Sequence, residues 1–473
     1  MGFNSSRDGA FKLAVLSNLH KVVDSTKLMS NFKKNTVLHI TPHLGGGVGR
    51  VLLNYLPKVK NDGRFSHEIA CMDYANEDAK RTASREGLLL ADNFFREHAG
   101  LIRKIADADI VLIHWWNHPL LYDFLVRESL SPCRIIMWSH ISGFNSPYVF
   151  VEPLFEYADL FVFTTPISYE TDEIKALPEK YKEKIRVVWS TSGTEHAAGV
   201  KPKPHGGFNV GYIGTVDYCK LHPDFIKMCG RVDIEDARFI VCGGHMDRQI
   251  YSETVKKGLG QRFLFKGKVD NINDYLAVFD VFGYPLAPYH YGTCEQALVE
   301  AMAAGVVPVV MANKTESYMV KDGVTGFVAD SENQYIQAIK KLHKNVNLRN
   351  ILSRKTKEEA LKRFSLETMI SEWNKIFGEI LSFPKTPKRW TGRFNGNDTT
   401  YFQVFIESLG GYGKPFEDYL YAKDNRLKNE ALERIANVIN SNHIWKSKTK
   451  GSIYHYNNFF EDNLFREITD KTG

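Results

Sequence analysis

The chain has 473 residues, of which 43% are hydrophobic and 25% are charged, which is typical of a soluble globular protein and excludes a disordered or collagen-like chain. No segment approaches the roughly 18 consecutive apolar residues that a membrane-spanning helix needs. The 61 Lys and Arg residues against 55 Asp and Glu residues leave a net charge of +6, too small and too dispersed an excess to indicate a nucleic-acid-binding protein. At about 150 residues per domain, the length predicts three domains, or two with an appendage.

The cysteines and the N-terminus indicate a cytoplasmic protein. The sequence has no CxxC pair, so we expect reduced thiols rather than a disulfide framework or a zinc site. The first residues are too polar for a secretory signal peptide. The six scattered cysteines are Cys71, Cys133, Cys219, Cys229, Cys242 and Cys294.

The first half of the chain alternates between apolar strands and helical patterns. Residues 8–32 are amphipathic, so we expect residues 1–34 to form an N-terminal helical segment. A buried strand over 36–40 precedes a glycine-rich loop and a helical pattern over 51–56, which is the opening βα unit of a Rossmann-like domain. The alternation predicts a parallel α/β domain over residues 35–198. Its further predicted strands are 110–114, 134–138, 160–164 and 185–189.

The same alternation begins again after a linker rich in proline, glycine and lysine at 199–207. A second Rossmann-like domain is predicted over 199–381, and a long helical run over 348–381 ends it. The remainder, 382–473, has no apolar strand pattern, and we expect a mainly helical extension with one clear helix over 418–439. The predicted strands of the second domain are 208–213, 239–242, 263–265, 281–284 and 307–310.

The first candidate for a binding site is the glycine-rich loop, Gly45-Gly46-Gly47-Val48-Gly49-Arg50. Glycines let backbone N–H groups approach a phosphate at the start of a helix. The loop departs from the dinucleotide-binding fingerprint because Arg50 occupies the position of its third glycine. A plain tight turn is the alternative, and Asp73, about twenty residues further on, leaves an NAD site as another.

Several motifs occur together in one order along the chain. Residues 295–310, EQALVEAMAAGVVPVV, contain a pattern close to EAMAxGxPVV with one extra residue, because Val306 and Val307 both precede the proline. Residues 267–269, 280–282 and 320–328 read GKV, DVF and VKDGVTGFV. With these motifs, the double glycine at 46–47 and His140 at a strand end, the chain resembles retaining glycosyltransferases of the GT-B fold, family 4. The resemblance covers about residues 36–380 and implies two Rossmann-like domains that face each other across a cleft.

The resemblance also implies a nucleotide-sugar donor and a set of residues that bind it. The second glutamate of the family motif, here Glu300, grips the ribose, and a lysine and an arginine hold the diphosphate. Lys220 keeps the place of that lysine, but Thr215 replaces the arginine. The first motif glutamate is Gly292 here, so we expect either backbone amides at 292–294 or the Glu295 carboxylate to serve the transferred sugar. The implied catalytic residues are His140, Lys220 and Glu300. The implied donor-binding residues are Gly46, Gly47, Arg50, Thr215, Val269, Gly292, Thr293, Cys294 and Glu295.

A cluster of aromatic and polar residues follows the strand predicted at 110–114. Because open α/β sheets bind ligands beyond the carboxyl ends of their strands, we expect Trp115, Trp116 and His118 to line the acceptor side of the cleft. The alternative is that the tryptophans belong to the core.

The residues present favour a front-side displacement, in which the leaving phosphate helps to deprotonate the acceptor hydroxyl. We expect no cofactor and no metal, because the one DxD match, Asp107 to Asp109, lies before a strand rather than after one. The expected function is transfer of a sugar to a glycan or lipid-linked acceptor in surface polysaccharide biosynthesis, in the cytoplasm or at the inner face of the membrane. The terminal segments are candidates for peripheral membrane contact, and solvated helices are the alternative. A non-catalytic GT-B scaffold that binds a partner or glycan, and a GT-B nucleotide-sugar epimerase, remain alternative functions.

Overall fold

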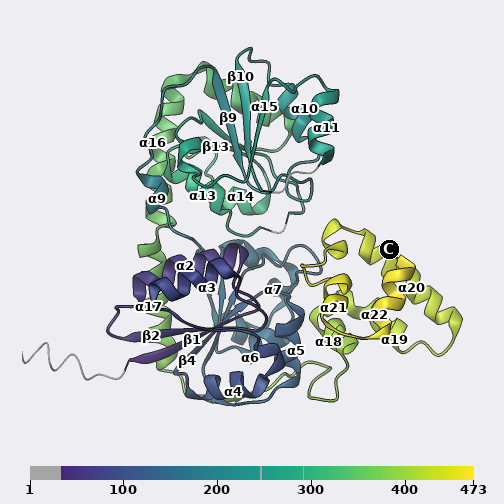
Figure 1. The fold of residues 1–473 in the computed structure, drawn as a ribbon. Coiled ribbons are helices and arrows are strands. Elements are labelled where there is room, and N and C mark those ends of the chain that lie inside the picture. The colour runs from purple at the N-terminus through teal and green to yellow at the C-terminus, as the bar shows by residue number, and fades with distance from the viewer. Residues whose placement is uncertain (1–33, 245–247, 291, 473) are drawn as a thin grey trace, which may run out of the picture.

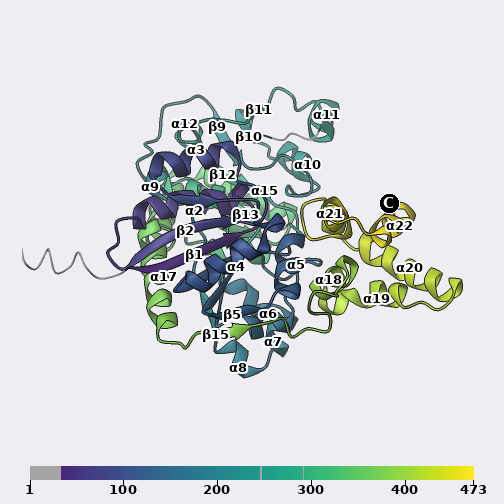
Figure 2. The same ribbon diagram turned by 60° about the horizontal axis from the view of Figure 1, so that its bottom comes forward.

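The computed structural model describes residues 34–472 except 245–247 and 291, so the N-terminal helix expected over 8–32 lies outside the described residues. Figure 1 shows two α/β domains, one above the other, and a group of C-terminal helices beside the first domain. The view in Figure 2 shows the same C-terminal helices beside the first domain. No described helix is both long enough and apolar enough to cross a membrane.

The first domain is built on a seven-stranded, fully parallel sheet with the strand order β3-β2-β1-β4-β6-β7-β8. Its central strands are buried and mostly apolar, as expected where helices cover both faces of a parallel sheet. The strands are β1 (Asn35–Thr41), β2 (Phe65–Cys71), β3 (Leu89–Ala91), β4 (Ile110–Trp115), β6 (Ile135–Ser139), β7 (Leu160–Phe163) and β8 (Ile185–Val187).

The second domain repeats this architecture on a six-stranded parallel sheet with the order β11-β10-β9-β12-β13-β14. Its strands are β9 (Phe208–Ile213), β10 (Ala237–Cys242), β11 (Phe263–Gly267), β12 (Val281–Tyr284), β13 (Val307–Met311) and β14 (Phe327–Ala329). Every strand predicted from the sequence is confirmed to within two residues at each end. Within these two sheets, the predictions missed β2, β3 and β14, because β3 and β14 have only three residues and β2 mixes half-buried polar residues with apolar ones.

Helices connect the strands on both faces of each sheet. In the first domain they are α2 (Gly46–Val59), α3 (Glu77–Glu86), α4 (His98–Asp107), α5 (Pro119–Arg127), α6 (Glu152–Tyr157), α7 (Asp172–Ala176) and α8 (Glu179–Lys182). Helix α9 (Glu195–Ala198) lies in the segment between the domains. In the second domain they are α10 (Phe225–Gly230), α11 (Arg248–Lys256), α12 (Asn273–Leu276), α13 (Gln296–Ala303), α14 (Lys314–Met319), α15 (Glu332–Lys344) and α16 (Val346–Arg363).

The long helical run predicted over 348–381 is two helices, because Ser365 begins a new helix, α17 (Leu366–Leu381), by accepting a hydrogen bond from the backbone of Thr368. Helix α17 returns to the first domain and completes its core. Trp373 packs against Trp138 with the ring centroids 4.8 Å apart. The chain therefore crosses between the domains twice, once before β9 and once at the start of α17.

The extension packs on the first domain. Its first residues form a short strand, β15 (Thr386–Lys388), which pairs with β5 (Leu130–Cys133) of the first domain. Its helices share one hydrophobic core with that domain. The single helix predicted over 418–439 is two, because Asp424 caps a new helix after a break. The helices are α18 (Tyr401–Ser408), α19 (Lys414–Leu420), α20 (Asn425–Asn440), α21 (Ile453–Phe459) and α22 (Asn463–Thr472).

Candidate functional site

A cavity of about 500 Å³ lies between the two domains, at the carboxyl ends of their strands. This is the position at which open α/β sheets bind ligands. Helix α2 and the end of β6 line it from the first domain, and the ends of β9 and β12 and the start of α13 line it from the second. The predicted site residues that line it are Gly47, Arg50, His140, Thr215, Lys220, Gly292, Thr293, Cys294, Glu295 and Glu300.

Glu300 lies on helix α13, and only 2% of its side chain is exposed. Its carboxylate forms an ion pair with Arg50 of helix α2, so this contact joins the two domains across the cleft. His196 Nε2 lies 3.0 Å from the same carboxylate oxygen. A buried carboxylate that faces a cavity, and whose partners are half-exposed, can exchange those partners for the hydroxyl groups of a ligand.

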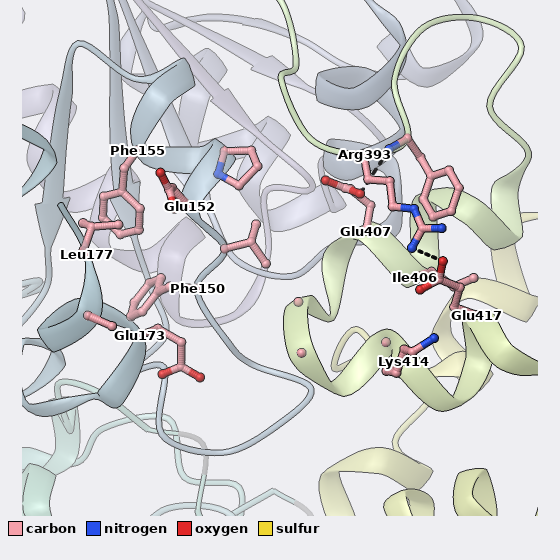
Figure 3. Close-up of a pocket in the computed structure, with 17 residues that line it drawn as sticks. Phe150, Glu152, Phe155, Glu173, Leu177, Arg393, Ile406, Glu407, Lys414 and Glu417 are labelled. Atoms are coloured by element: carbon pink, nitrogen blue, oxygen red, sulfur yellow. Dashed lines mark hydrogen bonds and ion pairs between the residues drawn. The ribbon is translucent and has the colours of Figure 1, made fainter. Parts of the chain in front are cut away.

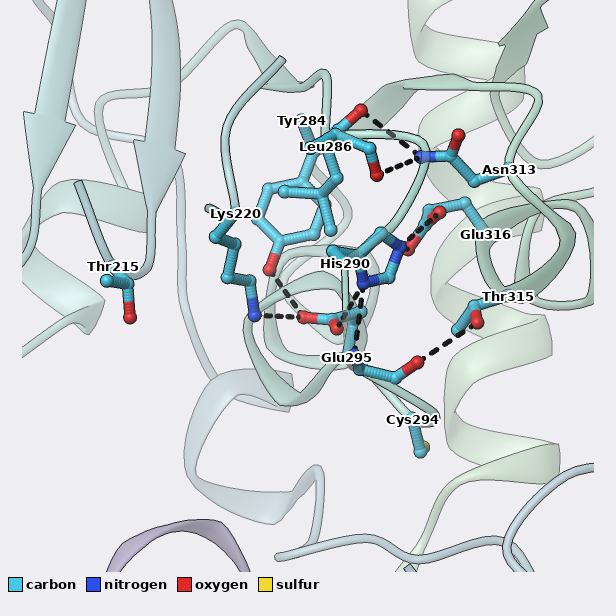
Figure 4. A network of polar contacts seen from close by, with 12 residues as sticks. Thr215, Lys220, Tyr284, Leu286, His290, Cys294, Glu295, Asn313, Thr315 and Glu316 are labelled. Atoms are coloured by element: carbon cyan, nitrogen blue, oxygen red, sulfur yellow. Dashed lines mark hydrogen bonds and ion pairs between the residues drawn. The ribbon is translucent and has the colours of Figure 1, made fainter. Parts of the chain in front are cut away.

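Lys220 belongs to a second, more deeply buried network, which Figure 4 shows. Its ammonium donates a hydrogen bond of 2.7 Å to Glu295 Oε2, and the hydroxyl of Tyr284 donates another of 2.7 Å to the same oxygen. Burial alone would raise the pKa of Glu295, but Lys220, His290 and the hydrogen bonds outweigh it and lower the pKa to about 2. Glu295 is therefore a stable carboxylate at neutral pH. Thr215 lies apart from this network, on the other side of Lys220 in Figure 4.

The Glu295 carboxylate lies directly beside Gly292. A side chain at position 292 would collide with the Glu295 carboxylate and would also approach His290. The carboxylate therefore occupies the space beside the position where the family pattern has its first glutamate. Residues 292–294 and Glu295 all line the cleft, so both expected substitutes for that glutamate, the backbone amides and the Glu295 carboxylate, stay predictions.

The cluster of His290, Glu295 and Glu316 brings potential metal-ligand atoms within 4.8 Å of one another. His290 Nε2 lies 3.1 Å from the Glu316 carboxylate. Burial alone would lower the pKa of His290, but Glu316 and Glu295 outweigh burial and raise it. Because the Lys220 ammonium is already bonded to Glu295 and His290 already contacts Glu316, the cluster is better described as a buried polar network than as a ligand set for a metal.

The Lys220–Glu295 pair predicts a loss of stability in acid. Because folding lowers the pKa of Glu295, its contribution to the free energy of unfolding is present above the ordinary glutamate pKa of about 4.3 and is lost as the pH falls from there towards about 2. The double variant Lys220→Met/Glu295→Gln removes both charges. We expect its free energy of unfolding to fall less steeply than that of the wild type in this window, as measured by urea unfolding at several pH values. An unchanged slope would contradict the assignment.

A smaller cavity of about 210 Å³ adjoins the cleft, with which it shares Gly47, Val48 and His140. Trp116 and Gly46 line it from the first domain, and Thr449 and Lys450 line it from the C-terminal extension. Burial and the nearby Lys220 ammonium lower the pKa of Lys450 to about 8. The extension thus brings a partly desolvated cation next to the cleft. Sequence reasoning missed Lys450, because it lies outside every recognised motif.

The structure corrects three of the predicted positions. Trp115 is fully buried and packs on Tyr122 and Phe150, so the core alternative holds for it. His118 is also buried; it caps helix α5 and packs beneath the extension, against His455 and Phe459. Val269 packs against the core of the second domain and is not among the described residues that line either cavity.

A third cavity, of about 550 Å³, lies between the first domain and the extension (Figure 3). Phe150, Phe155 and Leu177 form its apolar wall on one side. On the other side Arg393 pairs with Glu417. None of its described lining residues belongs to the second domain, so this cavity is outside the interdomain cleft.

Residues 207–345 match the family model described as glycosyl transferases group 1. No curated protein matches the sequence. Among solved structures, a glycosyltransferase from Rickettsia africae ESF-5 superposes with a TM-score of 0.59 at 14% identity, covering 74% of this chain and 100% of that one. HepE from Anabaena, in complex with UDP, gives 0.58 at 13% identity, with 73% and 100% covered. A mutant of TarM from S. aureus, in complex with fondaparinux, α-GlcNAc-glycerol and UDP, gives 0.55 at 11% identity, with 73% and 100% covered.

The fold predicted from the resemblance, two Rossmann-like domains of the GT-B type with a helical C-terminal region, is confirmed.

Proposed function

We propose that the protein is a retaining glycosyltransferase of family 4, which moves a sugar from a nucleotide-sugar in the interdomain cleft to a hydroxyl of a glycan or lipid-linked acceptor. The observation that carries the proposal is the pairing of two buried carboxylates, Glu295 and Glu300, with cations at the strand ends of one cavity. This arrangement provides separate contacts for the hydroxyl groups and for the phosphates of such a donor.

In this proposal, Glu300 accepts hydrogen bonds from the ribose hydroxyls. Arg50 pairs with Glu300, and because 47% of the Arg50 side chain is exposed, it can turn towards the diphosphate when the ribose binds. Lys220 and Lys450 supply further positive charge, and the Gly47 amide lines the same space. Positive groups fixed around the diphosphate stabilise the charge that develops on it as the sugar departs.

The carboxylates that line the cleft help to distinguish between two mechanisms of sugar transfer. A double displacement needs a carboxylate nucleophile at the anomeric carbon. Among the described residues that line the cleft, the carboxylates are Glu295 and Glu300; Lys220 and Tyr284 hold Glu295, and Glu300 is assigned to the ribose hydroxyls. A front-side displacement, in which the leaving phosphate receives the acceptor proton, therefore fits these residues better. We propose that it proceeds without a metal or cofactor.

The acceptor is proposed to enter the smaller cavity beside His140. Trp116 and Tyr148 line it and provide aromatic surface of the kind that binds apolar and sugar faces. Its other wall comes from the extension, which would then select the acceptor. Because HepE and the TarM mutant were solved with UDP, UDP-sugars are the first donors to test. A role in surface polysaccharide biosynthesis, at the cytoplasmic face of the membrane, completes the proposal.

One observation favours a second candidate, a non-catalytic GT-B scaffold: both Arg50 and Lys220 are bound to carboxylates in this structure. Incubation with a panel of UDP-, GDP- and ADP-sugars, with and without lysate acceptors, separates the two functions. We expect release of nucleotide from one donor and faster release with acceptor. No turnover with any donor would overturn the enzyme proposal, and an epimerised donor without transfer would indicate the epimerase instead.

Replacing Lys450 with methionine tests the contribution of the extension. The substitution removes a partly desolvated cation beside the diphosphate position and keeps most of the side-chain volume. We expect nucleoside diphosphates to bind about ten- to a hundredfold more weakly, the range expected for one charged hydrogen bond. The matched control is Lys448→Met, an exposed lysine of the same loop, which should leave affinity unchanged. Equal affinities of the two variants in calorimetric titrations would contradict the role of Lys450.

A further inference from the structure

Four histidines form a continuous hydrogen-bonded row across the sheet of the first domain. His67 Nδ1 lies 2.9 Å from His39 Nε2, His39 Nδ1 lies 3.1 Å from His114 Nε2, and His114 Nδ1 lies 3.1 Å from His140 Nε2. The residues come from strands β2, β1 and β4 and from the residue that follows β6. His140 is the last member, and it lines both the cleft and the smaller cavity.

The strand register explains how the row forms. His67 is paired with Val37, two residues before His39; His39 is paired with Leu112, two residues before His114. His114 is paired with Trp138, two residues before His140. A two-residue offset keeps every side chain on the same face of the sheet. The row therefore runs diagonally from the middle of β2 to the carboxyl end of β6, where the cleft lies.

The two ends of the row are half-buried, and its middle is fully enclosed. His39 and His114 are 0% exposed, whereas His67 and His140 each retain partial exposure. Burial lowers the pKa of all four, to about 4 for His67 and to about 3 for His140, so the rings are neutral at physiological pH. The charged groups near the outer end are Asp62 and Lys34, which act on His67 in opposite directions.

A neutral imidazole has one donor and one acceptor nitrogen. An unbroken row of four rings therefore has only two proton arrangements in which every hydrogen bond joins a donor to an acceptor. In the first, every ring is protonated on Nε2, and His140 presents the unprotonated Nδ1 to the cleft. In the second, every ring is protonated on Nδ1, and His140 presents an N–H. Any mixture would place two N–H groups or two lone pairs against each other inside the sheet, which leaves buried polar atoms unsatisfied.

We propose that the four histidines act as one tautomerically coupled unit, in which His67, His39 and His114 are positioning residues that hold the cleft nitrogen of His140 as a hydrogen-bond acceptor for a ligand hydroxyl. For the direction, we infer that Nε2 of His67 carries the proton, because Nδ1 is bonded to His39 and, of the two charges near the outer end, Asp62 acts on His67 more strongly than Lys34. The role of His140 at the cleft is thus determined at the far side of the sheet. The coupling of the four rings concerns the protein alone, whereas the ligand hydroxyl rests on the proposed binding of a donor or acceptor in the cleft.

Nuclear magnetic resonance of the full chain labelled with ¹⁵N-histidine tests the proposal, because two-bond ¹H–¹⁵N correlations identify the protonated nitrogen of each ring. At neutral pH we expect all four histidines to be neutral and protonated on Nε2. In His67→Phe, the row loses its outermost acceptor, and we expect His140 to show a mixture of tautomers although it lies three hydrogen bonds away. The matched control is His98→Phe, because His98 is also half-buried in the first domain and also packs against a phenylalanine.

Each outcome decides the proposal. Unlike tautomers among the four rings in the wild type would overturn the coupling, and uniform Nδ1 protonation would overturn the acceptor role of His140. An unchanged His140 spectrum in a folded His67→Phe would also overturn the coupling. Thermal unfolding confirms that the variant is folded, and His67→Gln replaces it if it is not. The wild-type spectrum alone remains decisive if both variants unfold.

Discussion

Replacing Lys220 with methionine is expected to lower the rate of sugar transfer at least about a hundredfold, the scale of losing one contact to charge that develops in a transition state. Lys220 is the cation that both lines the cleft and lies in its deeper network, where Glu295 orients it through a hydrogen bond of 2.7 Å. The substitution also leaves the buried Glu295 without its ammonium partner, so the pKa of Glu295 should rise and the protein should lose stability. Steady-state kinetics with the donor identified by the panel measures the change.

The double variant Lys220→Met/Glu295→Gln separates catalysis from folding. It removes both members of the pair, so it should recover stability relative to Lys220→Met while its activity remains low. Lys227→Met is the charge control, because Lys227 forms exposed ion pairs in the same domain. If Lys220→Met transfers sugar within a few-fold of the wild-type rate, the assignment of Lys220 is wrong.

Replacing Glu300 with alanine is expected to have the second large effect, and should also lower the rate of sugar transfer by about a hundredfold or more. Glu300 is the buried carboxylate proposed to grip the donor ribose, and it also joins the two domains through Arg50. Its removal should therefore raise the KM for the donor as well as lower kcat, because both the ribose contact and the placement of helix α2 are lost. Kinetics over a range of donor concentrations measures both constants.

The control for this substitution is Glu359→Ala. Glu359 is a mostly buried glutamate of the second domain that pairs with Lys321 and Arg363, and it is not among the described residues lining the cleft. We expect near-normal transfer from the control. A Glu300→Ala enzyme with unchanged constants, or an equal loss in the control, would refute the specific role of Glu300.

The sequence motifs predicted those parts of the site that are local in the chain. Helix α13 and strand β13 form as the signature indicates, and Gly305, with φ +80°, lies in the turn between them. Glu300 and Lys220 both line the cleft, as their positions within the two motifs predicted. Local patterns are sufficient when a side chain's direction is set by the element that contains it.

The rest of the site depends on contacts between distant segments. Trp115 and Trp116 are adjacent in sequence, but successive residues at a strand end point to opposite faces, so one is in the core and the other lines a cavity. Lys450 approaches Lys220 only because the extension folds back over the first domain. His39, His67 and His114 are isolated polar residues within three separate strands, and only the register of the sheet brings them together.

The most direct test of the account is calorimetric titration of UDP, GDP and ADP into the wild-type protein, Glu300→Ala and Glu359→Ala. The account predicts that one nucleoside diphosphate binds saturably to the wild type and to Glu359→Ala, with one site per chain, and that Glu300→Ala weakens this binding by at least about tenfold. If none of the three nucleotides binds, or if Glu300→Ala binds as tightly as the wild type, the cleft is not the donor site that we propose.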